Sequence, residues 1–324
     1  MLSPAAPTLY TFPDRAYGAR LQLECALGGE VWGTFTGKTY RTYCAHSPDK
    51  TAAELHSMFS DPYTKLVVTA VGGFCSNSIL QEIDWDLLAR SPTAICGYSD
   101  ATALLLAIYA RTQQVVIHGP AYLSQWGDPR GPLSESKSVF LSTICNTQGT
   151  RELKYTGYWK SPRTDWSDKS ASFHDAPSQY GPWRTLIPGS ARGALVGGNV
   201  ETLNMLIGTA YTPCFTGAIV FMEATGAEAY LPRLHRALVH LRHAGIFAEA
   251  SGIIFGRSPD AAPCGDTSLD DVVLDVVGSY GVPTVIDVDL GHTEPMMAFP
   301  IGCAAILDAR KPEPKLVIEE PAVS

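Results

Sequence analysis

A serine stands where an apolar run meets a helix-like run, in the segment Cys96-Gly97-Tyr98-Ser99-Asp100-Ala101. Between a strand and a helix, a serine hydroxyl projects from the carboxyl edge of the sheet, and the N–H groups that begin the helix can stabilise an oxyanion. The segment matches the G-x-S-x-G nucleophile elbow of α/β-hydrolases except at Ala101. Serine and aspartate also favour helix caps, so these residues alone leave both a nucleophile and a cap open.

A serine nucleophile needs a base, and a histidine at the same sheet edge could supply it. The sequence has eight histidines. His292 follows the apolar, β-branched run at 284–288 and is the best candidate. His118 ends another such run and stays possible.

The base in turn needs an acid that orients it. Glu223 ends an apolar strand-like run, where an unpaired carboxylate is unfavourable, and Asp289 and Glu294 are rivals for the role. Ser99, Glu223 and His292 each fall just past the carboxyl end of an expected strand, where α/β sheets gather their sites. This shared placement favours Glu223, although a purely structural buried carboxylate stays open.

Glycine pairs follow two of the expected strands, as Gly72-Gly73 and as Gly197-Gly198 before Asn199. The N–H of Gly73 could act as a second oxyanion donor beside that of Asp100. Glycines that serve only a tight turn are the alternative. The sequence has neither the dinucleotide-binding nor the P-loop glycine pattern, so we expect no nucleotide cofactor held in those ways.

The elements that position these residues alternate along the chain. We expect strands over 65–70, 93–96, 115–118, 192–196, 218–222, 252–255 and 284–288, and helices over 51–59, 83–88, 100–111, 200–207, 231–242 and 269–279. This alternation predicts an α/β fold with parallel sheets and helices on their faces. Residues 133–190 lose periodicity and are expected to form a long loop.

The loop divides the chain. We expect an N-terminal domain over residues 1–150 that carries the nucleophile, a Trp-bearing loop over 151–190, and a C-terminal domain over 191–324 that carries acid and base. A length of 324 residues allows two such domains. The first expected strand comes late, since the loop-like Ser3-Pro4-Ala5-Ala6-Pro7 follows the start directly, so an opening strand is absent or shortened.

Composition excludes several functions. The net charge is −8 and no basic cluster occurs, which argues against a nucleic-acid polymer as partner. No apolar run reaches the length of about 20 residues that spans a bilayer, and no secretory signal is present. The eight scattered cysteines form no C-x-x-C pair, which predicts reduced thiols, no disulfide framework, no zinc site and a cytoplasmic protein.

Several motifs together resemble the LD-carboxypeptidase family of serine peptidases, over nearly the whole chain. They are Gly72-Gly73-Phe74-Cys75-Ser76-Asn77, Gly97-Tyr98-Ser99-Asp100-Ala101, Gly197-Gly198-Asn199-Val200-Glu201-Thr202-Leu203, Gly291-His292 and Pro300-Ile301-Gly302. Within the family, the Ser-Asn after the glycine pair and the long Trp-bearing loop resemble the microcin C immunity branch.

The resemblance implies a Ser-His-Glu triad of Ser99, His292 and Glu223, with the N–H groups of Gly73 and Asp100 as oxyanion donors. It implies an N-terminal parallel-sheet domain, a smaller C-terminal α/β domain, an active site in the cleft between them, and a homodimer. It calls for no metal and no organic cofactor.

In the immunity branch, loop tryptophans stack on the nucleotide of a peptidyl-adenylate-like substrate. Trp159, Trp166 and Trp183 occupy the corresponding loop here, and Asn199 is a plausible polar contact. Packing of these tryptophans against the domain stays an alternative. The sequence also departs from the family, which often has a second acid where Ala224 stands.

We therefore predict a serine-type carboxypeptidase that cleaves an amide at the carboxyl end of a short peptide or aminoacyl-nucleotide, in self-immunity or detoxification. Three alternatives stay open. They are a murein tetrapeptide LD-carboxypeptidase of wall recycling, an α/β-hydrolase esterase, and a non-catalytic module that binds nucleotides or peptides.

Overall fold

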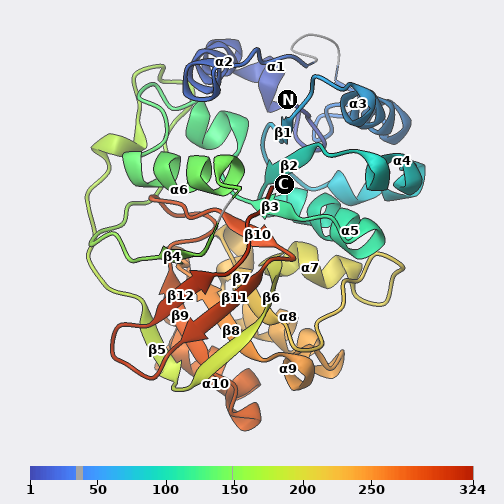
Figure 1. Cartoon of the computed structure of the whole chain (residues 1–324). Helices are drawn as coiled ribbons and strands as arrows, with labels where there is room; N and C mark the ends of the chain where they lie inside the picture. The colour runs from blue at the N-terminus through green and yellow to red at the C-terminus, as the bar shows by residue number, and fades with distance from the viewer. Residues whose placement is uncertain (34–38, 148, 324) are drawn as a thin grey trace.

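The computed structural model describes residues 1–33, 39–147 and 149–323. Figure 1 shows an N-terminal half, coloured blue to green, above a C-terminal half, coloured yellow to red. Each half has a β-sheet of its own with helices beside it. The expected α/β class with two domains is confirmed.

The N-terminal sheet has four strands in the order β1-β2-β3-β10. Strands β1 (Leu66–Val68), β2 (Ala94–Gly97) and β3 (Val116–His118) run parallel, as short apolar runs separated by helices predict. Strand β10 (Phe299–Ile301) comes from much later in the chain and pairs antiparallel with β3. The helices of this half are α1 (Thr8–Thr11), α2 (Pro13–Leu27), α3 (Pro48–Ser60), α4 (Trp85–Arg90), α5 (Thr102–Thr112) and α6 (Ser134–Cys145).

The first residues lie beside β1. The N–H of Leu2 donates to the carbonyl of Val68 at 3.0 Å, and the N–H of Ala70 donates to the carbonyl of Leu2 at 2.7 Å. Leu2 and Thr69 form a parallel bridge of one residue pair. The segment before Ser3 thus pairs with the sheet over a single residue.

The C-terminal sheet has eight strands in the order β4-β12-β11-β6-β7-β8-β9-β5. Its centre is parallel and consists of β6 (Ser190–Asn199), β7 (Ile219–Glu223), β8 (Gly252–Gly256) and β9 (Thr284–Val288). The outer strands are antiparallel, namely β4 (Arg151–Leu153), β5 (Arg184–Ile187), β11 (Ala304–Asp308) and β12 (Lys315–Ile318). The helices are α7 (Val200–Leu206), α8 (Leu231–His243), α9 (Ile246–Glu249) and α10 (Leu269–Val277).

The expectation of one long loop over residues 133–190 is wrong where α6, β4 and β5 form. The apolar pattern of the sequence did not predict helix α6, because the buried residues of this helix include Ser136 and Thr143 beside Phe140. Both polar side chains are hydrogen-bonded, since Thr143 Oγ1 donates to the carbonyl of Val139 at 2.7 Å and Ser136 Oγ donates to Glu294 Oε2 at 2.9 Å. Strands β4 and β5 join the C-terminal sheet and β10 joins the N-terminal one, so the exact domain boundaries stay a prediction.

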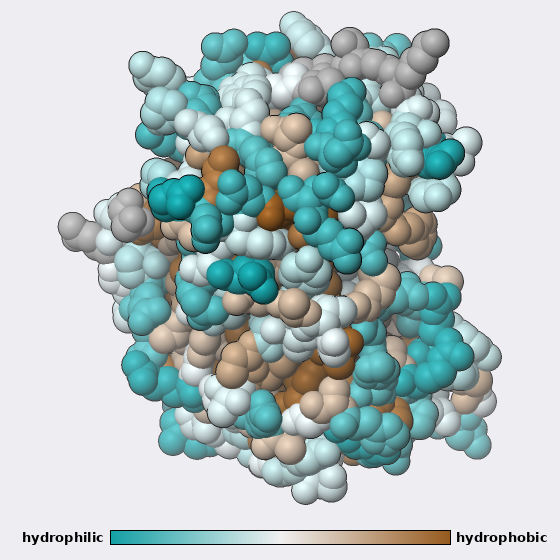
Figure 2. All heavy atoms as spheres, turned by 90° about the vertical axis from the view of Figure 1, so that its right-hand side faces the viewer, coloured by the Kyte–Doolittle hydropathy of each residue, from teal (hydrophilic) through white to brown (hydrophobic). Residues whose placement is uncertain are grey.

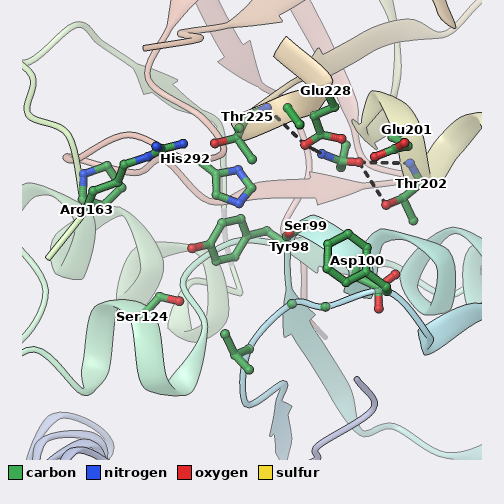
Figure 3. Close-up of a pocket in the computed structure, with 18 of the residues that line it drawn as sticks. Tyr98, Ser99, Asp100, Ser124, Arg163, Glu201, Thr202, Thr225, Glu228 and His292 are labelled. Carbon is green, nitrogen blue, oxygen red and sulfur yellow. Dashed lines mark hydrogen bonds between the residues drawn. The ribbon is translucent and has the colours of Figure 1, made fainter. Parts of the chain in front are cut away.

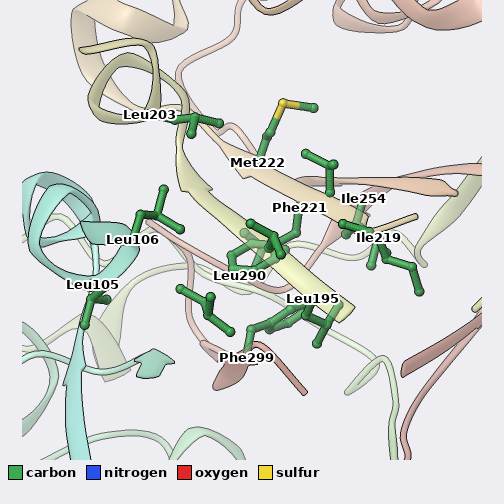
Figure 4. Packing of buried hydrophobic residues seen from close by; sticks show 14 of the residues in the cluster. Leu105, Leu106, Leu195, Leu203, Ile219, Phe221, Met222, Ile254, Leu290 and Phe299 are labelled. Atoms are coloured by element: carbon green, nitrogen blue, oxygen red, sulfur yellow. The ribbon is translucent and has the colours of Figure 1, made fainter. Parts of the chain in front are cut away.

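One hydrophobic cluster runs through both halves. Leu105 and Leu106 of α5 belong to the same buried cluster as Phe221 of β7, Leu195 of β6 and Phe299 of β10 (Figure 4). All five side chains are fully buried. Burial of such side chains stabilises a fold by about 1.5–3 kcal/mol each, so the two halves pack as parts of a common core.

Cys44 and Cys75 form a disulfide, so the expectation of reduced thiols throughout is wrong for this pair. Their sequence separation of 31 residues gave no sign of it, because the pairing depends on how two loops fold together. The cysteine pattern thus lends less support to a cytoplasmic location, which stays a prediction. None of the helices within the three described ranges combines the length and apolar character that crossing a bilayer requires. The face in Figure 2 is mostly hydrophilic, with hydrophobic side chains in separate areas.

Candidate active site

Ser99 begins a short 3-10 turn, η2 (Ser99–Ala101), which joins β2 to α5. Its φ is +60°, a left-handed conformation that a non-glycine residue keeps only where its surroundings enforce it. Glycine makes room for the side chain, because a Cβ at Gly72 would lie 2.7 Å from Ser99 Oγ. Neither η2 nor α5 has a side-chain cap hydrogen bond, so the helix-cap alternative lacks support.

His292 and Glu223 form a hydrogen-bonded pair, with 2.8 Å between His292 Nδ1 and Glu223 Oε2. Glu223 is the last residue of β7 and is fully buried, whereas the side chain of His292, in the loop after β9, is 20% exposed. Gly291, with φ +76°, permits this approach, because a Cβ there would lie 2.5 Å from Glu223 Cγ. The Tyr98 ring packs against His292, with 4.8 Å between the ring centroids.

The two partners shift each other's pKa. Burial lowers the pKa of His292, but Glu223 with its hydrogen bond, together with Glu228 and Asp260, raises it by more, so it lies above the ordinary 6.5. Burial raises the pKa of Glu223, but His292, together with His118 and Asn199, lowers it by more, so the net shift is downward. The carboxylate is therefore ionised at neutral pH and holds one nitrogen of the imidazole.

The rival acids and the second histidine bond elsewhere or lie closed off. Asp289 Oδ1 accepts from Arg257 Nε at 2.6 Å, and Glu294 Oε2 accepts from Ser136 Oγ at 2.9 Å. His118 is fully buried, and burial lowers its pKa to about 4. It is neutral and closed off from solvent, so of the residues weighed for base and acid the structure pairs only His292 and Glu223 at this site.

The loop after β1 is anchored next to the serine. Asp100 Oδ2 accepts from the N–H groups of Cys75 at 3.0 Å and Ser76 at 2.9 Å, and Ser76 Oγ donates to the carbonyl of Asp100. On the other side the loop lies close to the N-terminal segment, since a Cβ at Gly73 would come within 2.8 Å of the nitrogen of Ala6. The N–H of Ala6 also donates to the carbonyl of Gly72 at 3.2 Å, so the loop is bound to Asp100 on one side and to the N-terminal segment on the other.

A cavity of about 830 Å³ collects these groups (Figure 3). Ser99, Asp100 and Gly73 line it from the N-terminal half, and His292 and Asn199 from the C-terminal half. The structure therefore brings the predicted nucleophile, base and oxyanion donors to one site between the domains, with Glu223 buried directly behind the base.

The three predicted tryptophans lie in different places. Trp166 lines the cavity, with the Arg15 guanidinium 4.3 Å from its ring. Trp183 is only 2% exposed and donates from Nε1 to Asp289 Oδ2 at 3.0 Å. Trp159 pairs with Gln179 in a β-bridge. Among the described residues, Trp166 is the only tryptophan that lines the cavity, and Trp159 and Trp183 lie outside its lining.

Asn199 caps helix α7, since its Oδ1 accepts from the N–H of Thr202 at 3.0 Å. Its Nδ2 donates to Glu228 Oε1 at 2.7 Å. Glu228 also lines the cavity and was missed by the sequence reasoning. The available signal was the spacing Thr225-x-x-Glu228, which is a capping box in the structure.

A strained serine at a strand-to-helix junction and a histidine bonded to a buried carboxylate line one cavity between two α/β domains, and this is the layout of a two-domain serine hydrolase. Sequence models of the LD-carboxypeptidase N-terminal and C-terminal domains match residues 1–119 and 192–307. The chain belongs to the LD-carboxypeptidase family and is a serine-type carboxypeptidase.

Known relatives cover almost the whole chain. The protein YocD of Bacillus subtilis strain 168 is named as a carboxypeptidase. It is 32% identical to this chain over 95% of this chain and 92% of its own length. The microcin C7 self-immunity protein MccF of Escherichia coli is 26% identical over 94% of this chain and 90% of its own length.

Solved structures agree. MccF in complex with glutamyl sulfamoyl guanosine matches with a TM-score of 0.91 and 25% identity, over 100% of this chain and 96% of that one. The muramoyltetrapeptide carboxypeptidase from Oxalobacter formigenes shares the fold, with a TM-score of 0.79 and 19% identity over 98% of this chain and 97% of that one. These likenesses confirm the expected family and its MccF-like branch.

Proposed function

We propose that the protein hydrolyses an amide at the carboxyl end of a short peptide or aminoacyl-nucleotide, with Ser99, His292 and Glu223 as a triad. One observation carries the proposal. The His292–Glu223 pair, joined at 2.8 Å, faces the same cavity as Ser99 with its strained backbone. A buried acid, a base bonded to it and a serine hydroxyl at the same cavity are what acyl transfer through a serine requires.

In the proposed reaction, Ser99 Oγ attacks the scissile carbonyl and its proton passes to His292 Nε2, because Nδ1 is bonded to Glu223. The N–H groups of Gly73 and Asp100 stabilise the oxyanion. His292 then protonates the leaving nitrogen, and a water molecule activated by the same imidazole hydrolyses the acyl-enzyme. No metal or organic cofactor takes part in these steps.

Two substrate classes remain candidates. Solved MccF structures hold glutamyl sulfamoyl guanosine and aspartyl sulfamoyl adenosine, which supports an aminoacyl-nucleotide. Trp166 at the cavity could stack on a base for about 1–3 kcal/mol. The positions of Trp159 and Trp183 outside the cavity lining leave a smaller stacking surface, which favours a murein tetrapeptide as the second candidate.

An esterase and a non-catalytic binding module have less support. An esterase of the single-domain α/β-hydrolase type would lack the cleft between two sheets. A non-catalytic binding module would have no need of the hydrogen bond between His292 and Glu223. A homodimer and a cytoplasmic location belong to the proposal as well, and the molar mass in solution tests the dimer.

The decisive experiment incubates wild-type protein and Ser99→Ala with an aminoacyl sulfamoyl adenosine and with a tetrapeptide that ends in D-Ala. Intact-mass detection then looks for products and for an acyl group on Ser99. We expect wild type to cleave at least one substrate, and removal of the serine to lower turnover by roughly 10³-fold or more. Equal turnover by both proteins would refute the mechanism.

A further inference from the structure

Glu228 brings a carboxylate to the wall of the cavity. It lies in the short turn η5 (Gly226–Ala229), which follows β7 and its terminal Glu223. Its side chain is half-buried, and its Oε1 accepts from Asn199 Nδ2 at 2.7 Å and from the N–H of Thr225 at 3.1 Å. Both donors are neutral, so these hydrogen bonds hold the carboxylate in place without an ion pair (Figure 3).

The other charged groups of the cavity are paired, except Asp100, which is buried and accepts from the N–H groups of Cys75 and Ser76. Arg163 pairs with Asp260 and Arg233 pairs with Glu201. The imidazole of His292 is bonded to Glu223. Within the part of the chain that the structure describes, Glu228 forms no ion pair with a lysine, arginine or histidine. Among the described residues of the cavity, Glu228 is therefore the half-buried carboxylate that a substrate meets without a cationic partner.

The surroundings make this carboxylate sensitive to a ligand's charge. Burial raises the pKa of Glu228 to about 7, and the nearby carboxylate of Glu223 contributes to this shift toward the neutral form. A cation bound at Glu228 would oppose both effects, whereas an anionic group would strengthen them. Complementary charge at such a position gives selectivity between related ligands.

We infer that Glu228 selects substrates whose acyl residue carries a free ammonium group, next to the amide that the proposed triad cleaves. This inference rests on the proposed function. The leaving groups of both candidate substrate classes carry a carboxylate or stand in for a phosphate, which Glu228 repels. The ammonium must therefore belong to the acyl side. Glu228 is a specificity-determining residue in this scheme and takes no part in proton transfer.

The test measures binding in the Ser99→Ala background, where no turnover is required. The probes are two pairs: aspartyl sulfamoyl adenosine with its N-acetyl derivative, and the tetrapeptide L-Ala-γ-D-Glu-L-Lys-D-Ala with its Nε-acetyl derivative. Calorimetry should show the free amine of at least one pair binding about tenfold or more tightly than its acetylated partner. Adding Glu228→Gln, which keeps the oxygen that accepts from Asn199 and Thr225, should bring that ratio near one.

Two further variants complete the design. Glu201→Gln combined with Arg233→Gln removes a paired carboxylate of the cavity together with its cation, so it should keep the preference. Ala227→Lys places an ammonium of the protein's own beside Glu228 and should abolish the preference, and it serves if Glu228→Gln does not fold.

The outcomes separate the two ideas. The inference is overturned if neither pair shows a preference, if the preference survives a folded Glu228→Gln or Ala227→Lys, or if both members of a pair weaken by the same factor. A protein that prefers free amines but cleaves neither substrate when Ser99 is present would refute the proposed function and leave the role of Glu228 standing. Cleavage of a substrate without a preference for free amines would refute the role of Glu228 and leave the proposed function standing.

Discussion

Replacing Gly291 by alanine should disable the proposed triad without touching any of its members. Gly291 precedes His292 and has φ +76°, and a Cβ there would lie 2.5 Å from Glu223 Cγ and 2.7 Å from Cδ. Ordinary contacts between carbon atoms need about 3.5–4.0 Å. The Glu223 side chain or the histidine loop must therefore retreat by roughly 1 Å, which breaks the 2.8 Å hydrogen bond to His292.

The size of the effect has two parts. A left-handed backbone at a residue with a Cβ costs about 1–2 kcal/mol, which lowers the stability. Loss of the orienting acid lowers kcat by about 10⁴ in well-studied triads. Because the retreating carboxylate keeps some of its field at the imidazole, we expect a kcat lower by about 10²–10⁴, or roughly 3–5 kcal/mol of barrier.

Gly281→Ala is the matched control. Its φ is +65° and a Cβ there would meet nothing within 4 Å, so it carries the backbone strain without the collision. Thermal unfolding should show a loss of stability for both variants, larger for Gly291→Ala because of the collision, and only Gly291→Ala should lose kcat on a substrate that wild type cleaves. The reasoning would be refuted if a folded Gly291→Ala variant kept the wild-type kcat, or if the two variants lost kcat equally.

Three more predictions concern single side chains. Glu223→Gln removes the charge that raises the pKa of His292, so an NMR titration of His292 should move to lower pH, and an unmoved titration would contradict the pairing. Asp100→Ala leaves two buried N–H groups beside Gly73 without their acceptor, so the unfolding free energy should drop by about 2–4 kcal/mol and kcat by at least tenfold. Asp100→Asn keeps an acceptor oxygen and should lose less of both. Equal losses in the two variants would argue that Asp100 does not anchor the loop. Burial raises the pKa of Glu294 from 4.5 to about 7, so the folded state binds its proton more tightly and stability falls as pH rises through that window. Urea unfolding between about pH 5 and 8 should show a flatter decline in Glu294→Gln, and parallel curves would assign the decline to other groups.

The parallel strands could be predicted from sequence because each is a continuous apolar run with a helix on either side. Strand β7 (Ile219–Glu223) is such a run, and its expected range of 218–222 differs by one residue. Helix α6 and strand β10 could not be predicted in this way. The buried face of α6 includes Ser136 and Thr143, which no apolar periodicity reveals. Strand β10 depends on a partner strand far away in the sequence.

The residues of the candidate site also fall into two groups, those that the sequence indicated and those that it did not. Ser99, Glu223 and His292 could be nominated from sequence because each lies at or just past the carboxyl end of a strand, where α/β sheets gather their sites. Ser99 follows a strand of one sheet, and the other two residues lie at strands of the other. The sequence did not reveal side-chain contacts between segments that lie far apart along the chain. The acceptor role of Asp100 needs the folded loop after β1, and Glu228 needs the turn after β7. No spacing rule reports such contacts between distant segments.

The path of the chain after β9 explains how two domains can hold one triad. β9 belongs to the C-terminal sheet, and β10, which starts at Phe299, pairs with β3 in the N-terminal sheet, with Phe299 opposite His118. The loop that carries His292 is therefore tied to both sheets, one at each end. Phe299 and Phe221, the latter two residues before Glu223, pack with 5.1 Å between ring centroids. Because the same buried cluster includes side chains of α5, which begins three residues after Ser99, any hinge motion between the domains must break this core. The distance between base and nucleophile is thus set by sheet pairing and packing, and we expect substrate entry to depend on the loops around the cavity.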